Sequence, residues 1–291
     1  MKKLASFQAY NTYDQATLDA QYNPRASVPD HVAIFERHAQ MSEKARYHFP
    51  CRLDVAYGPS DAERLDIFPS EIKGAPVLIY FHGGFWRSRD KADFSFLSRA
   101  FVPLGATLVL VNYALCPAVS MDTLIGQCFK AIAWTQRHCT EFGGDSERVF
   151  VAGHSAGAHI ATMALIADAE GSGPMPKGYL KGGTAISGLF ELEPVRRSYV
   201  NSDLRLTPEQ VERNSPWRHL PNRSAPLVVT VGQLETAEFR RQSLEFGEAW
   251  TERGLPGETF EVPHHHHYTI LDVLLDPTSR LMNAMRQQIG I

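Results

Sequence analysis

Four uninterrupted runs of apolar residues constrain the fold of this chain more than any other feature. They cover residues 76–81, 107–111, 149–152 and 226–231, and segments of helical length lie between and after them, chiefly residues 121–141, 156–168 and 236–253. A strand without polar alternation is typical of a parallel sheet that helices cover on both faces. Strands that alternate with helices predict right-handed β-α-β crossovers. We therefore expect an α/β fold with a doubly wound, mostly parallel sheet.

The N-terminal part of the chain has a different pattern. Residues 1–50 form a polar extension, in which a helix is expected to begin near Asp30 with Val32, Phe35 and Ala39 on one face. Residues 53–57 and 65–68 then alternate between polar and apolar side chains, with a Gly-Pro turn after the first run. Two such runs predict an antiparallel hairpin before the parallel strands begin.

Residues 189–222 interrupt the alternation of strands and helices. Within them Thr207 and Gln210 fit a capping box, with Pro208 at the first helical position. We expect one or two short helices here, forming a small cap above the sheet.

Residues 153–157, Gly-His-Ser-Ala-Gly, follow the third apolar run and open a helix of small residues. A serine on a tight strand-to-helix turn adopts strained backbone geometry, and flanking glycines leave room for it. The turn presents the Ser155 hydroxyl at the carboxyl ends of the strands, where open α/β sheets bind ligands. A turn that merely connects two elements is the alternative, but the strand before it and the helix after it favour a nucleophile.

Residues 82–86, His-Gly-Gly-Phe-Trp, leave the first apolar run. Acyl transfer needs N–H donors that point at the oxyanion of the tetrahedral intermediate, and a glycine loop exposes its backbone donors. We expect Gly83 and Gly84 to supply donors from this loop. Ala156 would supply another from the N-terminus of the helix after Ser155.

A serine nucleophile also needs a base and a carboxylate that orients it, and α/β-hydrolases carry them in the order serine, acid, histidine. Glu235, just after the fourth apolar run, is the best-placed acid. Glu238 is its rival, and a helix-start glutamate is the non-catalytic alternative. The base is expected in the histidine run at residues 264–267, after the strand predicted at residues 258–262. We assign His267, which lies nearest the following helix-like segment.

The same histidine run raises the question of a metal site. Neighbouring side chains on a loop point in different directions, whereas zinc ligands come from separated positions. The four cysteines show no C-x-x-C pair and no dense disulfide pattern; they are Cys51, Cys116, Cys128 and Cys139. We expect free thiols, no metal and no other cofactor.

These motifs, together with residues 238–243 (Glu-Phe-Arg-Arg-Gln-Ser), resemble the kynurenine formamidase, or arylformamidase, branch of the α/β-hydrolases. The resemblance extends from about Tyr57 to the C-terminus. It implies the α/β-hydrolase fold, and it places the acid at Glu235 and the base at His267. Two positions depart from the family pattern: its acid is usually Asp, and Thr269 stands where the family tends to have Asp.

The resemblance implies a serine hydrolase that cleaves a formyl amide through a Ser-His-Glu triad and an acyl-enzyme. Phe85 and Trp86 are expected to form an aromatic wall for an aryl substrate, with core packing an equal alternative for Trp86. A carboxylesterase acting on short-chain or aryl esters is the nearest alternative. A hydrolase-fold protein that binds a small ligand without turnover is a more distant one.

The charge and hydropathy of the sequence limit the classes of partner that the protein is expected to bind. The sequence has 29 basic and 32 acidic residues and a formal charge of −3, so nucleic acid is not expected to bind. No apolar run approaches the roughly 18 residues that span a bilayer, and no signal-peptide h-region follows the first residues. We expect a cytoplasmic, single-domain protein over residues 1–291 with a small-molecule substrate and no membrane partner; the sequence is compatible with a homodimer.

Overall fold

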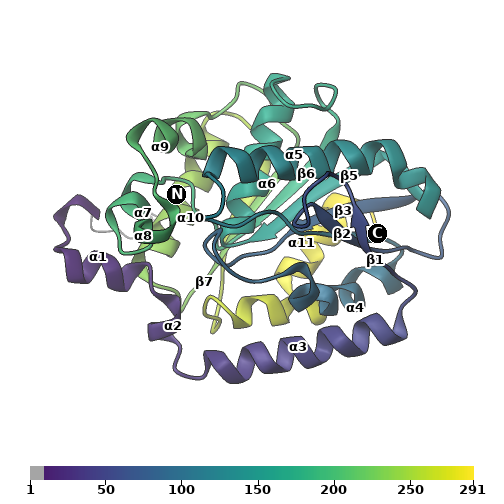
Figure 1. The fold of residues 1–291 in the computed structure, drawn as a ribbon, viewed down its shortest axis with the longest axis horizontal. Helices are drawn as coiled ribbons and strands as arrows, with labels where there is room; N and C mark the ends of the chain where they lie inside the picture. The colour runs from purple at the N-terminus through teal and green to yellow at the C-terminus, as the bar shows by residue number, and fades with distance from the viewer. Residues whose placement is uncertain (1–9) are drawn as a thin grey trace.

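The computed structural model describes residues 10–291, so the start of the N-terminal extension, including the residues expected to lack an h-region, lies outside the described residues. Its centre is an eight-stranded sheet in the order β1-β2-β4-β3-β5-β6-β7-β8 (Figure 1). The strands are β1 (Arg52–Ala56), β2 (Arg64–Phe68), β3 (Ala75–Phe81), β4 (Thr107–Val111), β5 (Gly144–His154), β6 (Leu180–Ile186), β7 (Leu227–Gly232) and β8 (Gly257–Val262).

The direction of the strands agrees with the sequence pattern. β1 and β2 form the expected antiparallel hairpin, and β2 also runs antiparallel to β4. Every neighbouring pair from β4 to β8 is parallel. The prediction of an α/β-hydrolase fold with a mostly parallel sheet is therefore confirmed.

Sequence analysis missed one strand, β6. Its residues include Lys181, Gly182 and Gly183, which break the apolar run that marks the other parallel strands. β6 nevertheless lies inside the sheet, between β5 and β7. A Cβ on Gly183 would come within 3.2 Å of Leu165 and 3.3 Å of Leu227, so a crowded position explains the small residue there.

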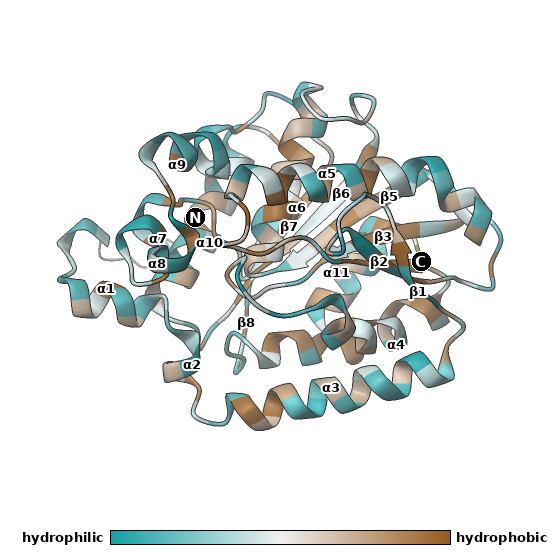
Figure 2. Ribbon diagram, viewed as in Figure 1, coloured by the Kyte–Doolittle hydropathy of each residue, from teal (hydrophilic) through white to brown (hydrophobic). Residues whose placement is uncertain are grey.

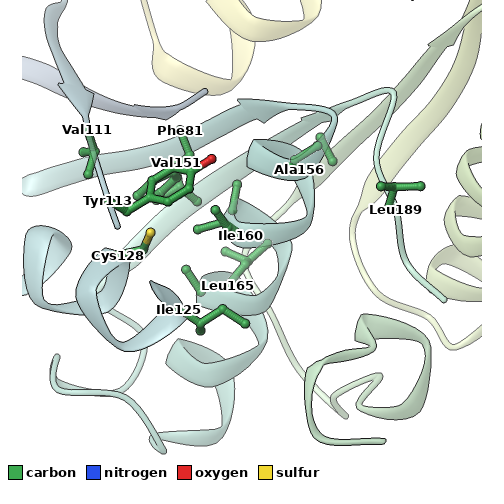
Figure 3. Close-up of a cluster of buried hydrophobic side chains, with 14 of the residues drawn as sticks. Phe81, Val111, Tyr113, Ile125, Cys128, Val151, Ala156, Ile160, Leu165 and Leu189 are labelled. Carbon is green, nitrogen blue, oxygen red and sulfur yellow. The ribbon is translucent and has the colours of Figure 1, made fainter. Parts of the chain in front are cut away.

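Helices cover both faces of the sheet. One face packs against α5 (Met121–His138), α6 (Ala156–Glu170) and α10 (Ala237–Glu252). Figure 3 shows part of this layer, with Ile160 of α6 below Phe81 and Val151 of the strands and Ile125 of α5 beside Leu165 of α6. The other face packs against α4 (Ser98–Phe101) and α11 (Arg280–Ile289), beyond which lies α3 (His31–His48) (Figure 1).

Helix α3 begins where expected, with Asp30 as its N-cap, but the face that carries Val32, Phe35 and Ala39 is not the face that the helix buries. Val32 is 55% exposed, and the helix instead buries Ile34, His38, Ser42 and Ala45. Two of these buried residues are polar and form hydrogen bonds. The Ser42 hydroxyl donates to the carbonyl of Asp93, and the His38 ring is hydrogen-bonded to the carboxylate of Asp272. Apolar periodicity does not detect a helix face that hydrogen bonds hold in place.

The expected cap contains more helices than predicted. Residues 189–222 include α7 (Glu193–Arg197), α8 (Asn201–Leu204) and α9 (Pro208–Asn214), and α9 begins with the predicted capping box. The helices α1 (Gln15–Gln21) and α2 (Pro24–Ser27) precede α3, and α1 is hydrogen-bonded to the cap through Asp19 and the Tyr199 N–H.

The remaining short elements are 3-10 helices: η1 (Tyr10–Thr12), η2 (Lys91–Leu97), η3 (Val102–Leu104), η4 (Cys139–Phe142), η5 (Pro216–Arg218) and η6 (Thr269–Leu275). Hydrophilic residues cover much of α1 and α9 at the periphery, whereas hydrophobic residues dominate α6 at the centre (Figure 2). None of the helices between residues 10 and 291 is long and apolar enough to cross a bilayer.

Candidate active site

Ser155 occupies a strained turn between β5 and α6. Its φ of 57° and ψ of −119° lie outside the regions that ordinary residues favour. The flanking glycines are required by close packing: a Cβ on Gly153 would lie 2.2 Å from the carbonyl carbon of Gly157, and one on Gly157 would lie 1.9 Å from the Phe81 carbonyl oxygen. The turn is the sharp strand-to-helix elbow that the sequence motif predicts.

Glu235 and His267 are in direct contact. The Nδ1–H of His267 donates to Glu235 Oε2 at 2.6 Å, and both side chains are almost fully buried. The other carboxylate oxygen, Oε1, accepts from the Ser187 hydroxyl at 2.5 Å and from the Gly232 N–H at 2.8 Å. Three donors thus fix this carboxylate at the end of β7, and it in turn orients the imidazole ring.

The structure separates the candidates that the sequence left open. Glu238 faces away from the histidine run and accepts hydrogen bonds from the Tyr22 hydroxyl and the Arg241 guanidinium. His266 has a local role, because its Nδ1 accepts from the N–H groups of Tyr268 and Thr269 at the start of η6. Glu235 and His267 are therefore the pair that the fold brings together.

Ser155 and His267 line one cavity of about 430 Å³. Gly83, Gly84 and Phe85 of the loop after β3 also line it. The N-terminal extension and the cap supply further walls; these residues are Asn23, Pro24, Arg25, Phe35, His38, Tyr199 and Asp203. Sequence analysis gave no signal for these residues, because they lie far from the motifs in sequence.

The expected oxyanion donors surround the serine. Gly84 has a φ of +121° and a Cβ there would meet the Ser88 carbonyl oxygen at 2.1 Å, so only glycine fits. A Cβ on Gly83 would lie 3.1 Å from the Ser155 Cβ, which places the Gly83 backbone beside the nucleophile. Ala156 is the first residue of α6, so its N–H has no acceptor within the helix.

The structure decides between the two alternatives given for Trp86. Phe85 lines the cavity as expected, but Trp86 is completely buried in the core and does not line it. The Trp86 ring packs edge-on against His159, with centroids 5.0 Å apart. Its size drives it into the core rather than into the cavity. The aromatic wall is completed instead by Phe94 and Tyr268, which sequence analysis did not single out.

His154, the residue before the nucleophile, lies against the base. Its ring centroid is 4.5 Å from that of His267, and its side chain is buried. Burial, with the neighbouring His267 ring adding to it, holds the pKa of His154 well below its usual value. The low pKa keeps the His154 ring neutral beside His267.

The histidine run forms no metal site. Within residues 10–291, no group of three or more His, Cys, Asp and Glu side chains is arranged to hold an ion. The carboxylate and the imidazole of the site are already satisfied by each other and by backbone and hydroxyl donors, as described above.

Comparison with known proteins agrees with this arrangement. Residues 78–213 match a family model described as the alpha/beta hydrolase fold. The chain is 32% identical to the kynurenine formamidase of Danio rerio, with 93% of each chain covered. The chain belongs to the kynurenine formamidase family of the α/β-hydrolases.

Two other relatives extend the comparison. The esterase LipQ of Mycobacterium tuberculosis is 26% identical over 82% of this chain and 62% of its own length. A crystal structure of a protein from Silicibacter sp. tm1040 superposes with a TM-score of 0.82 at 26% identity, covering 92% of this chain and 98% of that one. Together with the family membership, these relatives identify this formamidase-family chain as a hydrolase, and the predicted resemblance is confirmed.

Proposed function

We propose that this chain is an arylformamidase, a serine hydrolase that cleaves the formyl amide of an aryl amine. The observation that carries the proposal is the buried Glu235–His267 pair, which shares one cavity with the strained Ser155. The family membership supports the formamide as substrate, because a relative that is 32% identical over 93% of the chain is a kynurenine formamidase.

In the proposed mechanism His267 removes the hydroxyl proton of Ser155, whose Oγ attacks the formyl carbon. The backbone N–H groups of Gly83, Gly84 and Ala156 stabilise the resulting oxyanion. The C–N bond then breaks, and His267 delivers its proton to the leaving aryl amine. Glu235 stabilises the imidazolium at each step.

The second half of the reaction releases the acyl group. After the first half Ser155 carries a formyl ester. A water molecule gives its proton to His267 and attacks this ester, and collapse of the second tetrahedral intermediate returns the proton to Ser155 Oγ. The products are formate and the free enzyme, so that no cofactor is consumed.

The test compares hydrolysis of N-formylkynurenine and of p-nitrophenyl acetate by the wild type and by Ser155→Ala. We expect the variant to lose at least about 1000-fold in kcat on both substrates. Ser98→Ala is the matched control, since this buried hydroxyl makes no hydrogen bond within residues 10–291; it should leave both rates unchanged. Undiminished turnover by Ser155→Ala would refute the serine mechanism.

A carboxylesterase is the second candidate, and the 26% identity to an esterase over most of the chain favours it. Formamide hydrolysis and ester hydrolysis would use the same triad, so the residues that line the cavity decide which substrate is preferred. A panel of formanilides and short-chain esters separates them: we expect higher kcat/KM for the aryl formamides, and a strong preference for esters would favour the alternative. A fluorophosphonate probe should label Ser155, whereas a protein that only binds ligands would not react.

A further inference from the structure

Each backbone N–H group that is expected to stabilise the oxyanion shares a peptide unit with the carbonyl of the preceding residue. The Gly83 N–H belongs to the same unit as the His82 carbonyl, and the Gly84 N–H to the same unit as the Gly83 carbonyl. Both units are trans, so their N–H and C=O groups point in opposite directions. A hydrogen-bond donor that holds one of these carbonyls therefore also sets the direction of the N–H group.

The His82 carbonyl is held by Tyr113, a residue just after β4. The Tyr113 hydroxyl donates to this oxygen at 2.7 Å, and both residues are buried. The Tyr113 ring also stacks on the His82 ring, with centroids 4.5 Å apart and an angle of 11° between the planes. Because the ring and the hydroxyl contact the same residue, the His82 carbonyl has little freedom to turn.

Tyr113 is a permanent donor at this position. It belongs to the buried layer drawn in Figure 3, and burial holds its pKa well above the usual value for a tyrosine. The hydroxyl therefore keeps its proton in any ordinary assay buffer. A carbonyl that accepts a buried hydrogen bond is also polarised, and this polarisation strengthens the N–H of the same peptide unit as a donor.

The loop that carries the donors, residues 82–86, is strained and is restrained from outside. Phe85 and Trp86 have φ values of 50° and 54°, which lie in the left-handed region that side chains rarely adopt. The segment after β4 also holds this part of the loop, because the Cys116 N–H donates to the Trp86 carbonyl at 2.8 Å. Tyr113 and Cys116 therefore restrain the loop at its two ends.

The other two expected donors are held by partners that lie close to them in the chain. The Nδ1–H of His82 donates to the Gly83 carbonyl at 2.8 Å. The Ser155 carbonyl, which shares a peptide unit with the Ala156 N–H, accepts from the His159 N–H at 3.2 Å. Tyr113, in contrast, lies 31 residues from His82. The orientation of the Gly83 N–H thus depends on a contact between distant segments.

We infer that Tyr113 is a positioning residue for the oxyanion hole, whose hydroxyl turns the His82–Gly83 peptide so that the Gly83 N–H faces the oxyanion. Tyr113 does not line the cavity, so it acts through this peptide unit and not on the substrate. The inference rests on the proposed function, because it takes an oxyanion to form beside Ser155. A Cβ on Gly83 would lie 3.1 Å from that of Ser155, which places the peptide unit at the reaction centre.

The test is Tyr113→Phe, which removes the hydroxyl and keeps the ring against His82. Hydrolysis is measured with p-nitrophenyl acetate and with N-formylkynurenine, because both reactions pass through an oxyanion. We expect kcat to fall about 10- to 100-fold on each substrate that wild type cleaves, which is less than the loss of a whole donor, while KM changes less than about 3-fold. Trifluoroacetophenone forms an oxyanion adduct with a serine nucleophile, so its inhibition should weaken by the same factor as kcat.

Tyr57→Phe is the matched control, because the Tyr57 hydroxyl is also buried and donates to a main-chain carbonyl, that of Asn112, at 2.6 Å. It should lower the free energy of unfolding to a similar extent, but leave kcat and the inhibition by trifluoroacetophenone unchanged. Replacement of Tyr113 by para-aminophenylalanine keeps a weaker donor at the same place. We expect this variant to lie between wild type and Tyr113→Phe in kcat and in inhibition.

Three results would overturn the inference. In the first, Tyr113→Phe keeps kcat within about 3-fold of wild type. In the second, Tyr57→Phe loses as much kcat as Tyr113→Phe. In the third, kcat of Tyr113→Phe falls while the inhibition by trifluoroacetophenone does not. If Tyr113→Phe does not fold, the para-aminophenylalanine variant decides: kcat and inhibition that fall by the same factor support the inference, and any other result contradicts it.

Failure of the proposed function gives a different result. A protein that cleaves the ester but not N-formylkynurenine would contradict the formamidase proposal, while the ester would still test Tyr113. Undiminished turnover by Ser155→Ala would contradict the serine mechanism and, with it, the oxyanion on which the role of Tyr113 depends.

Discussion

Replacement of Glu235 by Gln tests the role of this carboxylate most sharply, because an amide cannot satisfy the three donors that surround it. Oε1 accepts from the Ser187 hydroxyl and the Gly232 N–H, and Oε2 accepts from His267 Nδ1. Glutamine has almost the same shape but only one oxygen. The substitution therefore changes hydrogen bonding and charge while it leaves the packing intact.

The two orientations of the amide are not equivalent, and the one that keeps the Gly232 N–H paired places His267 in the wrong tautomer. If the oxygen of the new amide side chain faces Ser187 and Gly232, its NH₂ group faces His267. The NH₂ group donates a hydrogen bond, so Nδ1 of His267 must be unprotonated. The ring proton then lies on Nε2, and the ring cannot act as a base toward Ser155. If the amide is reversed, its NH₂ opposes the Gly232 N–H, and a buried donor loses its partner. We expect kcat to fall about 1000- to 10,000-fold and stability to fall by about 1 to 3 kcal/mol.

The assay measures kcat for N-formylkynurenine and p-nitrophenyl acetate, together with urea unfolding of each variant. Glu238→Gln is the matched control: it lies three residues further along, is equally buried, and bonds Tyr22 and Arg241 instead of His267. It should lower stability without a comparable loss of kcat. The reasoning is refuted if Glu235→Gln retains kcat within tenfold of wild type, or if folded Glu238→Gln loses as much.

Two further predictions concern stability. Tyr22→Phe removes a buried hydroxyl that donates to Glu238 and accepts from Gln242. We expect urea unfolding to show that the free energy of unfolding falls by about 1 to 2 kcal/mol. A fall below about 0.3 kcal/mol would contradict the role of Tyr22 in anchoring the N-terminal extension to α10. Burial lowers the pKa of His159 to about 4, so below about pH 6.5 the unfolded chain binds a proton that the folded chain does not, and stability falls as the pH falls toward 4. The unfolding free energy of wild type, relative to His159→Gln, should drop by about 2 kcal/mol between about pH 7 and about pH 5; equal pH dependence in the two proteins would show that His159 does not titrate as described.

Sequence analysis predicted the parts of the fold that depend on neighbouring residues in the chain, such as strands and tight turns. Strands buried on both faces leave uninterrupted apolar runs, and the hairpin leaves alternation, so the sheet was predicted apart from β6. The elbow at Ser155 and the glycine at Gly84 were predicted because backbone crowding admits almost no other residue there. The buried face of α3 and the place of Trp86 were not decided by the sequence, since long-range packing determines them.

Local signals favoured Glu235 and His267 as acid and base but did not exclude their rivals, for the same reason. Glu235 and Glu238 are both close to the end of β7, and both are buried. What distinguishes them is the partner each one reaches, and those partners lie 32 residues away at His267 and 216 residues away at Tyr22. The walls formed by the N-terminal extension and the cap likewise depend on contacts between distant segments.

The segment at residues 238–243, which carries the most specific part of the family resemblance, has a structural role that its position beside the acid does not suggest. Glu238 and Gln242 bond the Tyr22 hydroxyl, which ties the N-terminal extension to α10. Gln242 also accepts from the N–H of Phe190 at the start of the cap, and the Phe239 ring lies 4.4 Å from that of His267. One turn and a half of helix thus joins the extension, the cap and the base. The segment therefore holds together the walls around the cavity, whereas the turn at Ser155 and the glycine loop hold the groups that are proposed to cleave the bond.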